Sequence, residues 1–446
     1  MTTISRAGAG AVNARRTRFL RRLTVATGGG MFLDGFVFAC IAVAVAGKAF
    51  RADLHTTPVW LGLISASTLV GTIIGGPLGG YCTDRFGRRP MFTADLCVFL
   101  VSSALLFFVR APWQIVALGV VMGLAVGADY AIGSPMLGEF TPAHNRGRYL
   151  GVLEILWNVG YVLAFFLGFL ITRIDPGAWR YALALGVVPA AIVLALRHGL
   201  PESPRWLMSQ GRHAEARAIL MEHLALDPHS PEFADEPTGE AGYRTLFGRE
   251  YLARTVFCCV FWICIVLPYF AITFFQADIL TTLGISDPVL TAVFGTCTAL
   301  AGAVLGWSLV DRIGRRKILI APMFVTALML SIVAGGQWLP HSLVVPAFFG
   351  YLFAYGVMSI LPGVYPLEVF PTSVRTTGMG VAAAASRIGS AIGTFLLPLA
   401  LAAFGLLPTM GLMVAVCLIG GLSSLALAPE TRGRALSVSG GPRKGL

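Results

Sequence analysis

The heptapeptide Thr-Asp-Arg-Phe-Gly-Arg-Arg at residues 83–89 returns 227 residues later, at 310–316, as Val-Asp-Arg-Ile-Gly-Arg-Arg. Each copy lies between two long apolar runs. Two further pairs of segments are related by nearly the same offset. Residues 139–142 match residues 368–371, and residues 201–203 match residues 429–431. Three matches at one period indicate a duplicated unit of about half the chain. The duplication therefore predicts a fold with two structurally related halves.

The composition is typical of a chain that is solvated by lipid. Apolar residues make up 56%, charged residues only 12%, and the mean hydropathy is +0.77, whereas soluble domains carry roughly 25% charged residues. At ~20 residues per crossing, we predict an all-α integral membrane protein with twelve transmembrane helices in two six-helix bundles. The predicted spans are 23–47, 58–82, 91–109, 112–136, 147–171, 179–197, 252–275, 287–310, 317–335, 341–364, 376–399 and 405–428.

Lys and Arg are distributed very unevenly between the predicted loops. With both termini in the cytoplasm, 27 of the 33 basic residues fall on the cytoplasmic side, five on the outer side and one inside a span. This bias predicts that orientation in the cell inner membrane. The net charge of +11 is spread over helix ends, so we interpret it as membrane topology and expect no nucleic-acid partner. The first apolar run is too long for a removable signal peptide and should stay in place.

The predicted organisation has five parts, which are a cytoplasmic tail at 1–22, an N-terminal bundle at 23–197, a cytoplasmic linker at 198–251, a C-terminal bundle at 252–428 and a cytoplasmic tail at 429–446. The chain contains no Gly-x-x-x-x-Gly-Lys nucleotide motif. Its eight cysteines lack metal or redox spacing, and its seven histidines fall in loops, the linker or span ends. We expect no cofactor, no metal and no enzymatic activity, and we expect a monomer.

Several motifs at the cytoplasmic ends of the spans resemble those of one transporter superfamily. Gly80-x-x-x-Asp84-Arg85-x-Gly87-Arg88-Arg89 resembles the loop motif of the major facilitator superfamily. Together with residues 146–148, 201–207 and 429–433, it is similar to the branch that contains sugar porters and metabolite:proton symporters. The resemblance covers about residues 20 to 434 and implies two bundles that rock about a central substrate site. One departure is Trp307, which stands where Gly80 stands in the first half.

The acidic and arginine residues of these motifs recur in both halves beside helix ends. There, ion pairs and helix dipoles can hold the two bundles together on the cytoplasmic side. The alternative is that the arginines only anchor topology. The predicted gate residues are Asp84, Arg85, Arg88, Glu139, Arg146, Glu202, Arg205, Asp311, Arg312, Arg315, Glu368, Arg375, Glu430 and Arg432.

Four charged residues stand out inside predicted spans, where a charge costs about 2.5–3.5 kcal/mol even on the lenient insertion scale. Asp34 and Arg387 each lie eleven residues from the cytoplasmic end of their spans, which is roughly 16 Å deep at 1.5 Å per residue. Asp129 and Glu154 are the other two. None has a charged counterpart in the other half at an offset of 228. Unshared buried charges indicate substrate or proton handling, because scaffolding should be shared between the halves.

We assign roles to these charges by their chemistry. Arg387 should pair with an anionic group of the substrate, because a guanidinium can form two parallel hydrogen bonds with a carboxylate. Asp34 or Asp129 should take up the coupling proton, with Glu154 as a further candidate, because removal from water favours the neutral acid and the approach of Arg387 favours the carboxylate. The alternative is a permanent ion pair between Asp34 and Arg387 that only joins helices.

Polar and aromatic residues on the fourth, fifth, seventh and tenth spans complete the predicted substrate site. They are Tyr130, Trp157, Asn158, Tyr161, Trp262, Tyr269, Gln276 and Tyr355. With Arg387, this set favours a small organic anion, and the segments at 268–271 and 387–389 resemble organic-acid and nicotinate-type symporters. The sequence therefore predicts a proton-coupled organic-anion transporter that works by alternating access. A sugar or polyol porter is the second interpretation, and a non-transporting membrane sensor is the third.

Overall fold

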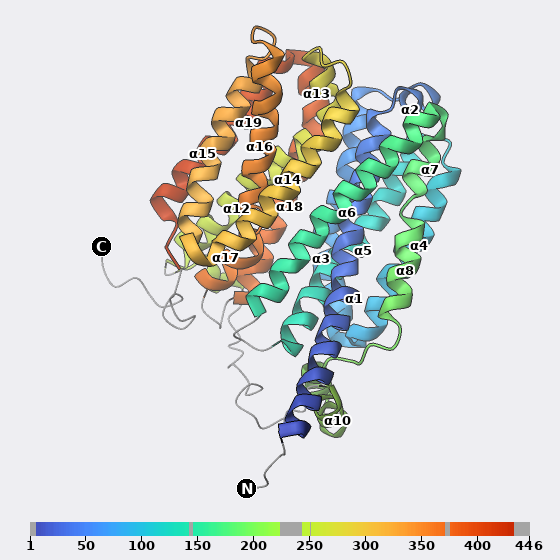
Figure 1. Cartoon of the computed structure of the whole chain (residues 1–446), viewed down its shortest axis with the longest axis vertical. Helices are drawn as coiled ribbons and strands as arrows, with labels where there is room; N and C mark the ends of the chain where they lie inside the picture. Colours follow the sequence, from blue (N-terminus) through green and yellow to red (C-terminus); the bar gives the residue numbers. More distant parts are fainter. Residues whose placement is uncertain (1–5, 142–145, 224–242, 250, 371–374, 432–446) are drawn as a thin grey trace.

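The computed structural model describes residues 6–141, 146–223, 243–249, 251–370 and 375–431. Nearly all of them are helical, and twelve helices are long and apolar enough to cross a membrane. This confirms the predicted fold class. Six of the twelve precede the linker region and six follow it (Figure 1).

The N-terminal half is built from α1 (Arg6–Ala46), α2 (Lys48–Asp53), α3 (Pro58–Phe86), α4 (Arg88–Leu105), η1 (Leu106–Phe108), α5 (Pro112–Phe140), α6 (Arg146–Ile174), η3 (Pro176–Ala178), α7 (Trp179–Ala184) and α8 (Val187–Arg197). Three short helices follow, α9 (Pro204–Ser209), α10 (His213–His223) and α11 (Tyr243–Leu246). The C-terminal half contains α12 (Leu252–Phe274), α13 (Gln276–Thr282), α14 (Pro288–Ile313), α15 (Arg315–Ala334), α16 (His341–Met358), α17 (Leu361–Val369), α18 (Arg375–Phe404) and α19 (Leu406–Leu427).

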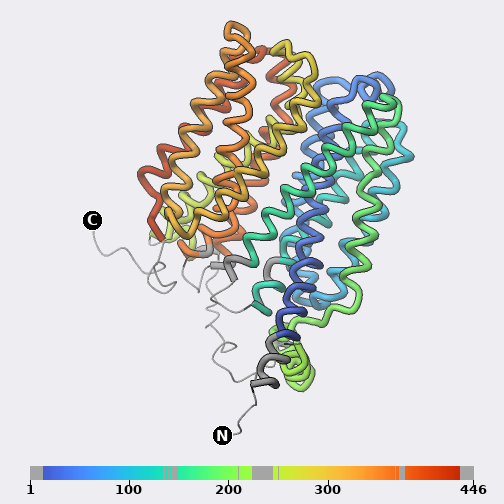
Figure 2. Tube along the Cα trace, in the orientation of Figure 1, coloured from blue at the N-terminus to red at the C-terminus, as the bar shows by residue number. Residues whose placement is uncertain are grey.

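The two halves lie side by side, the first coloured blue to green and the second yellow to red (Figure 1). We call the end at which α1 begins and α19 ends the inner end, and the opposite end, which carries α2 and α13, the outer end. Between the halves, α3 packs against α18 and α6 packs against α14, and the neighbouring courses of α6 and α14 can be followed in the trace of Figure 2.

Two predicted spans are interrupted in the structure. The span at 179–197 is divided into α7 and α8, and the span at 341–364 into α16 and α17. Pro189 and Pro362 explain the breaks, because proline has no amide hydrogen to donate to the carbonyl four residues earlier and its ring crowds that carbonyl. Those carbonyls belong to Leu185 and Met358, where the first segments end.

Small residues let α1 and α6 approach each other closely at mid-span. A Cβ atom at Gly35 would lie 2.0 Å from the backbone oxygen of Trp157, and one at Gly160 would lie 2.0 Å from that of Phe32. Small residues at helix crossings commonly permit such backbone contact in membranes. Here the contact places Asp34, the neighbour of Gly35, at the level of the aromatic residues of α6.

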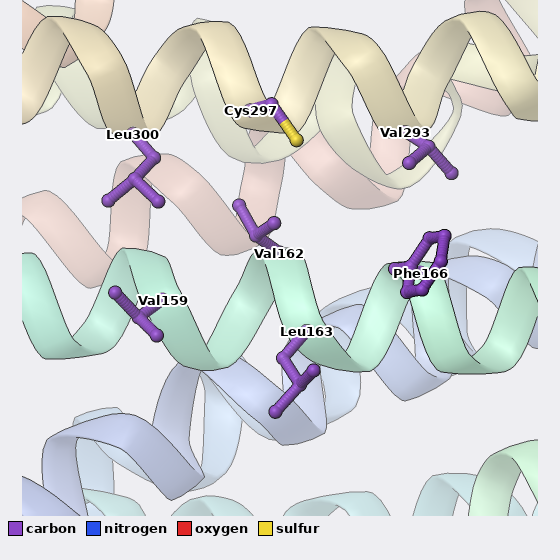
Figure 3. A pocket seen from close by; sticks show the side chains of 7 residues that line it. All are labelled: Val159, Val162, Leu163, Phe166, Val293, Cys297 and Leu300. Atoms are coloured by element: carbon purple, nitrogen blue, oxygen red, sulfur yellow. The ribbon is translucent and has the colours of Figure 1, made fainter.

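An open groove of about 250 Å³ runs between α6 and α14. Figure 3 shows Val162 of α6 opposite Cys297 of α14, and the lining residues of both helices are apolar or, for Cys297, a thiol. Because this lining offers no polar group to a ligand, the groove does not coincide with the charged residues at mid-span.

Candidate functional site

Three of the predicted charges lie between the two halves at mid-span. Asp34 of α1 is fully buried, and both of its carboxylate oxygens lack a hydrogen-bond partner within the described residues. Arg387 of α18 and Glu154 of α6 stay partly exposed. Glu154 faces the second half, since a Cβ atom at Gly363 of α17 would lie 3.6 Å from its Oε1. The fourth charge, Asp129, is held elsewhere.

Arg387 is surrounded by aromatic rings from both halves. Its guanidinium carbon lies 5.1 Å from the ring centroid of Tyr130 in α5 and 5.7 Å from that of Phe270 in α12, which is the range of cation–π contacts. Its charge interacts electrostatically with Asp34 and Glu154. No described carboxylate lies within 4.0 Å of it, so no Asp34–Arg387 ion pair joins the helices among these residues.

Aromatic side chains fill the space outward of Arg387. Tyr269 of α12 and Tyr355 of α16 stack with 3.6 Å between centroids and an interplanar angle of 3°. Trp157 and Tyr161 of α6 stack at 5.6 Å, and Trp157 lies 6.3 Å from Tyr269. Phe38 of α1, which the sequence analysis missed, lies 5.2 Å from Phe270. Such pairs gain energy beyond simple burial, so this cluster joins α1, α6 and α12 across the two halves.

The remaining predicted site residues surround this cluster. The Asn158 side chain donates to the backbone oxygen of Glu154 at 3.0 Å, and Trp262 is buried in α12. Gln276 begins α13 at the outer end, where it is buried and neither its amide nitrogen nor its amide oxygen has a partner among the described residues. Gln276 therefore lies apart from Arg387 but presents an unsatisfied donor and acceptor.

Asp129 belongs to a buried charge cluster inside the N-terminal half. Its Oδ1 accepts a hydrogen bond from Nη2 of Arg197 at 2.5 Å, and Nη1 of Arg197 donates to Asp95 Oδ2 at 3.1 Å. The side chains of Arg197, Asp95 and Asp129 are 2%, 2% and 4% exposed. Asp95 and Arg197 were missed in the sequence analysis, although both are charges within predicted spans.

At the outer end, two ion pairs join the halves. Arg51 of α2 contacts Asp278 of α13 at 2.5 Å, and Arg173 at the end of α6 contacts Asp287 before α14 at 3.3 Å. Among the ion pairs that the described residues form, these are the ones that bridge the halves. The molecule is therefore held together at its outer end.

At the inner end, the repeated motifs make equivalent contacts within each half. Glu202 accepts from the backbone amides of Arg88 and Arg89 at 2.9 and 3.1 Å, and Glu430 accepts from those of Arg315 and Arg316 at 3.1 and 3.3 Å. Both acids thus sit at a helix N-terminus, where the dipole favours them. The glycines between the paired helices have φ of 97° and 100°, a conformation that glycine adopts without strain.

Arg315 carries the further contacts that the second half shows. Its guanidinium donates twice to Glu368, at 2.7 and 3.0 Å, and contacts Asp311 at 3.0 Å.

The other predicted gate residues differ in what the structure describes. Four of them are exposed, namely Asp84, Arg85, Arg205 and Arg312. The side chains of Glu139, Arg146 and Arg375, and the whole of Arg432, lie outside the described part. The gate stays a prediction, since the hydrogen bonds and ion pairs described for these residues each lie within one half. Trp307 packs on Gly151 of α6, across the two halves.

The sequence matches the family model of the sugar (and other) transporters over residues 23–438. It is 35% identical over 426 residues to the inner membrane metabolite transport protein YgcS of Escherichia coli, covering 95% of this chain and 94% of the relative. It is 26% identical over 348 residues to the niacin transporter NiaP of Acinetobacter baylyi, covering 76% and 77%. The partially occluded inward-open xylose transporter XylE of E. coli aligns with a TM-score of 0.78 at 21% identity, covering 92% of this chain and 100% of that one.

Proposed function

Because the chain belongs to the sugar (and other) transporter family of the major facilitator superfamily, we propose that it moves a small organic anion across the inner membrane, coupled to protons, by alternating access. It is a multi-pass membrane transporter and not an enzyme. The inner-membrane location is supported by the name of the E. coli relative, and the cytoplasmic placement of both termini by the distribution of Lys and Arg.

The surroundings of Arg387 carry the proposal of an anionic substrate. A guanidinium that lies at mid-span, partly exposed and without a described carboxylate within 4.0 Å, retains its capacity for two-pronged pairing with a carboxylate. A charge at this depth is costly unless it faces a partner or a polar space. The rings of Tyr130 and Phe270 beside it offer faces on which a flat aromatic acid would stack.

The acids near Arg387 support proton coupling. Asp34 is fully buried without a hydrogen-bond partner among the described residues, and Glu154 lies within electrostatic reach of the same guanidinium. A substrate carboxylate that pairs with Arg387 neutralises the charge that favours ionised Asp34. Proton uptake on Asp34 would then accompany anion binding, which is the linkage that symport requires.

One relative bears on the substrate class. The Acinetobacter protein is named a niacin transporter, and niacin as its nicotinate anion is a small aromatic carboxylate. We propose this class, with nicotinate as the first compound to test. At 26% identity the name supports a test of the class and does not identify the compound.

A sugar or polyol is the second candidate substrate. The matched family is that of sugar and other transporters, and the aligned E. coli structure is a xylose transporter. Gln276 supplies the observation within this chain, because its buried amide leaves a donor and an acceptor unused among the described residues, and such groups suit hydroxyls.

The two halves at 23–197 and 252–428 are the bodies that we propose to rock against each other. Ion pairs and aromatic contacts hold them at the outer end in this structure. In the opposite state these contacts would separate, and the predicted gate residues at the inner end would meet. We propose that a single chain carries out this cycle.

A binding screen of the purified protein would test the proposal. Thermal stabilisation would be measured with monocarboxylates, aromatic carboxylates including nicotinate, and sugars including D-xylose, for the natural chain, for Arg387→Ala and for the exposed-site control Arg217→Ala. The proposal predicts stabilisation by one or more carboxylates, retained in Arg217→Ala and lost in Arg387→Ala. Stabilisation by sugars alone, equal in all three proteins, would contradict it in favour of the second candidate.

A further inference from the structure

A row of three residues on one face of α1 connects the inter-half site with the charge cluster of the N-terminal half. Thr27, Gly30 and Asp34 are spaced by three and four residues, which places them above one another on a helix. A Cβ atom at Gly30 would lie 2.0 Å from Asp129 Oδ2 and 2.1 Å from Arg197 Nη2. The Asp129–Arg197 pair therefore packs on the backbone of α1, one turn inward of Asp34.

Arg197 is the centre of this cluster. At the inner end of α8, it donates to the backbone oxygens of Ala26 in α1 and Phe92 in α4, at 3.2 and 3.1 Å, as well as to Asp95 and Asp129. Its guanidinium carbon lies 3.8 Å from the centroid of the Phe92 ring. Arg197 thus holds the carboxyls of Asp95 in α4 and Asp129 in α5 against α1.

The charges in this cluster do not balance if all three carboxyls ionise. One guanidinium faces Asp34, Asp95 and Asp129, all of them at most 5% exposed, so full ionisation would leave two excess negative charges. Arg387, which acts on Asp34 from the C-terminal half, would offset one. Burying an uncompensated charge is strongly unfavourable, so the cluster should hold at least one proton.

The unused oxygens show where that proton can reside. Both oxygens of Asp34 and Oδ2 of Asp129 have no hydrogen-bond partner within the described residues, whereas both oxygens of Asp95 accept from Arg197. The hydroxyl of Thr27, fully buried one turn further inward, also lacks a partner there. Polar atoms left unpaired at such depth are usually bridged by water or protonated.

From this arrangement we propose that Asp129 is a second proton site, which receives the coupling proton from Asp34 and passes it towards the inner end along the Thr27 face of α1. The proposal rests on proton coupling at Asp34. In the step, the carboxylic O–H bond of Asp34 breaks and an O–H bond forms on Oδ2 of Asp129, directly or through one bridging water. Asp34 becomes a carboxylate opposite Arg387, and Asp129 later releases the proton to water at the inner end.

Arg197 and Asp95 act in this scheme as positioning residues. Arg197 binds Oδ1 of Asp129 and leaves Oδ2 turned towards α1. Asp95 fixes Arg197 through its other guanidinium nitrogen but offers no free oxygen to a proton.

The first test uses the full chain in proteoliposomes with radiolabelled nicotinate as the probe. Accumulation driven by a proton gradient would be compared with equilibrium exchange, which needs no net proton movement. For Asp129→Asn, exchange should stay within about twofold of the natural chain while accumulation falls at least about tenfold. Asp129→Glu, which keeps a carboxyl at this position, should restore accumulation. Loss of exchange and accumulation to the same extent in Asp129→Asn would overturn the proposal, because a purely structural role lowers both.

The second test needs no substrate, so it separates this proposal from the choice of nicotinate. Infrared difference spectra between acidic and alkaline pH would be recorded on the purified chain, following the carbonyl stretch of protonated carboxyls. Two acids that share a proton titrate as a pair. Asp34→Asn and Asp129→Asn should therefore each change the same carbonyl band. A band that is unaltered in Asp129→Asn would overturn the relay, whatever the substrate is.

Discussion

Arg51 and Asp278 occupy equivalent positions in the two halves, 227 residues apart, and their side chains meet at 2.5 Å. The offset is that of the repeated heptapeptide, so α2 and α13 are related by the same duplication. Residues at equivalent positions can touch only near the axis that relates the halves. The pair therefore marks this axis at the outer end, with opposite charges where a symmetric duplication would have placed like ones.

We expect this pair to bias the transporter towards its outward-closed state. Arg51→Asp places two acids on the axis and should favour separation at the outer end, while the exchange Arg51→Asp with Asp278→Arg should restore closure. Because the side chains are 29% and 32% exposed, the pair is worth at most about 1 kcal/mol, or a population shift of about fivefold.

Distances between spin labels would measure this shift. Labels would be placed at the exposed positions Ala52 and Ser286, in a chain without its exposed native cysteines. The single variant should add a longer distance, and the double exchange should remove it. An unchanged distribution in Arg51→Asp would show that the aromatic cluster and the Arg173–Asp287 pair keep the outer end closed without Arg51 and Asp278.

The second prediction concerns Arg387. Arg387→Lys keeps the charge but loses the planar fork, so carboxylate affinity should fall, and Arg387→Ala should lower it further. Losing a charge-assisted hydrogen bond costs roughly 1.5–3 kcal/mol, or about tenfold to a hundredfold in affinity. Calorimetric titration of the purified variants with the carboxylates identified by the screen would measure this loss.

The same variants examine whether Arg387 only joins helices. If so, Arg387→Ala would destabilise the fold by leaving Asp34 unpaired, and adding Asp34→Asn would recover both stability and transport. The absence of a described ion pair between these residues leads us to expect unchanged stability in Arg387→Ala. Recovery of transport in the double variant would exclude the anion clamp.

The third prediction tests how tightly α1 packs on the buried pair. Gly30→Ala places a Cβ atom 2.0 Å from Asp129 Oδ2, and disrupting a buried ion pair costs about 3–5 kcal/mol. This exceeds the ~1 kcal/mol that alanine gains in a helix. Gly76→Ala in α3 is the control, because its nearest neighbour lies at 4.0 Å. The thermal midpoint should fall in Gly30→Ala and stay level or rise in Gly76→Ala. Equal midpoints would show that α1 moves aside.

The fourth prediction concerns pH and the contact between α10 and α1. His223 stacks on Phe19 with centroids 4.4 Å apart, and Glu222, Arg15 and Arg22 are the charges around it. Burial lowers the pKa of His223 below its ordinary value, with Arg15 and Arg22 acting in the same direction and Glu222 opposing them. The folded contact thus binds fewer protons than the unfolded chain, and its stability should be lost as the pH falls below the ordinary histidine range.

Hydrogen exchange of the α10 amides at about pH 7.5 and about pH 5.5, on either side of the ordinary histidine pKa, would check this sign. After correction for intrinsic rates, protection should drop at the lower pH. His223→Phe keeps a ring in the stack and should remove the pH dependence, whereas His213→Gln, at the exposed start of α10, should retain it. A pH dependence that survives in His223→Phe would assign the effect to another group.

The sequence predicted the span count, the repeat and three of the charges at the site, because charges within apolar runs stand out and a duplication leaves a fixed offset. It did not predict the breaks at Leu185 and Met358, although Pro189 and Pro362 could have signalled them. The pairing of Asp129 with Arg197 was also out of reach. It depends on four helices that meet around Gly30, and the spacing of residues along one helix carries no information about which neighbour packs against it.

Uptake of radiolabelled nicotinate into proteoliposomes tests the central claim most directly. An imposed proton gradient, acidic on the side from which uptake occurs, should drive accumulation above the external concentration. A protonophore should reduce it to the equilibrium level, and Asp34→Asn should behave like the natural chain with protonophore while still exchanging the label. Accumulation that persists in the presence of protonophore, or uptake of D-xylose but not nicotinate under the same gradient, would contradict the account.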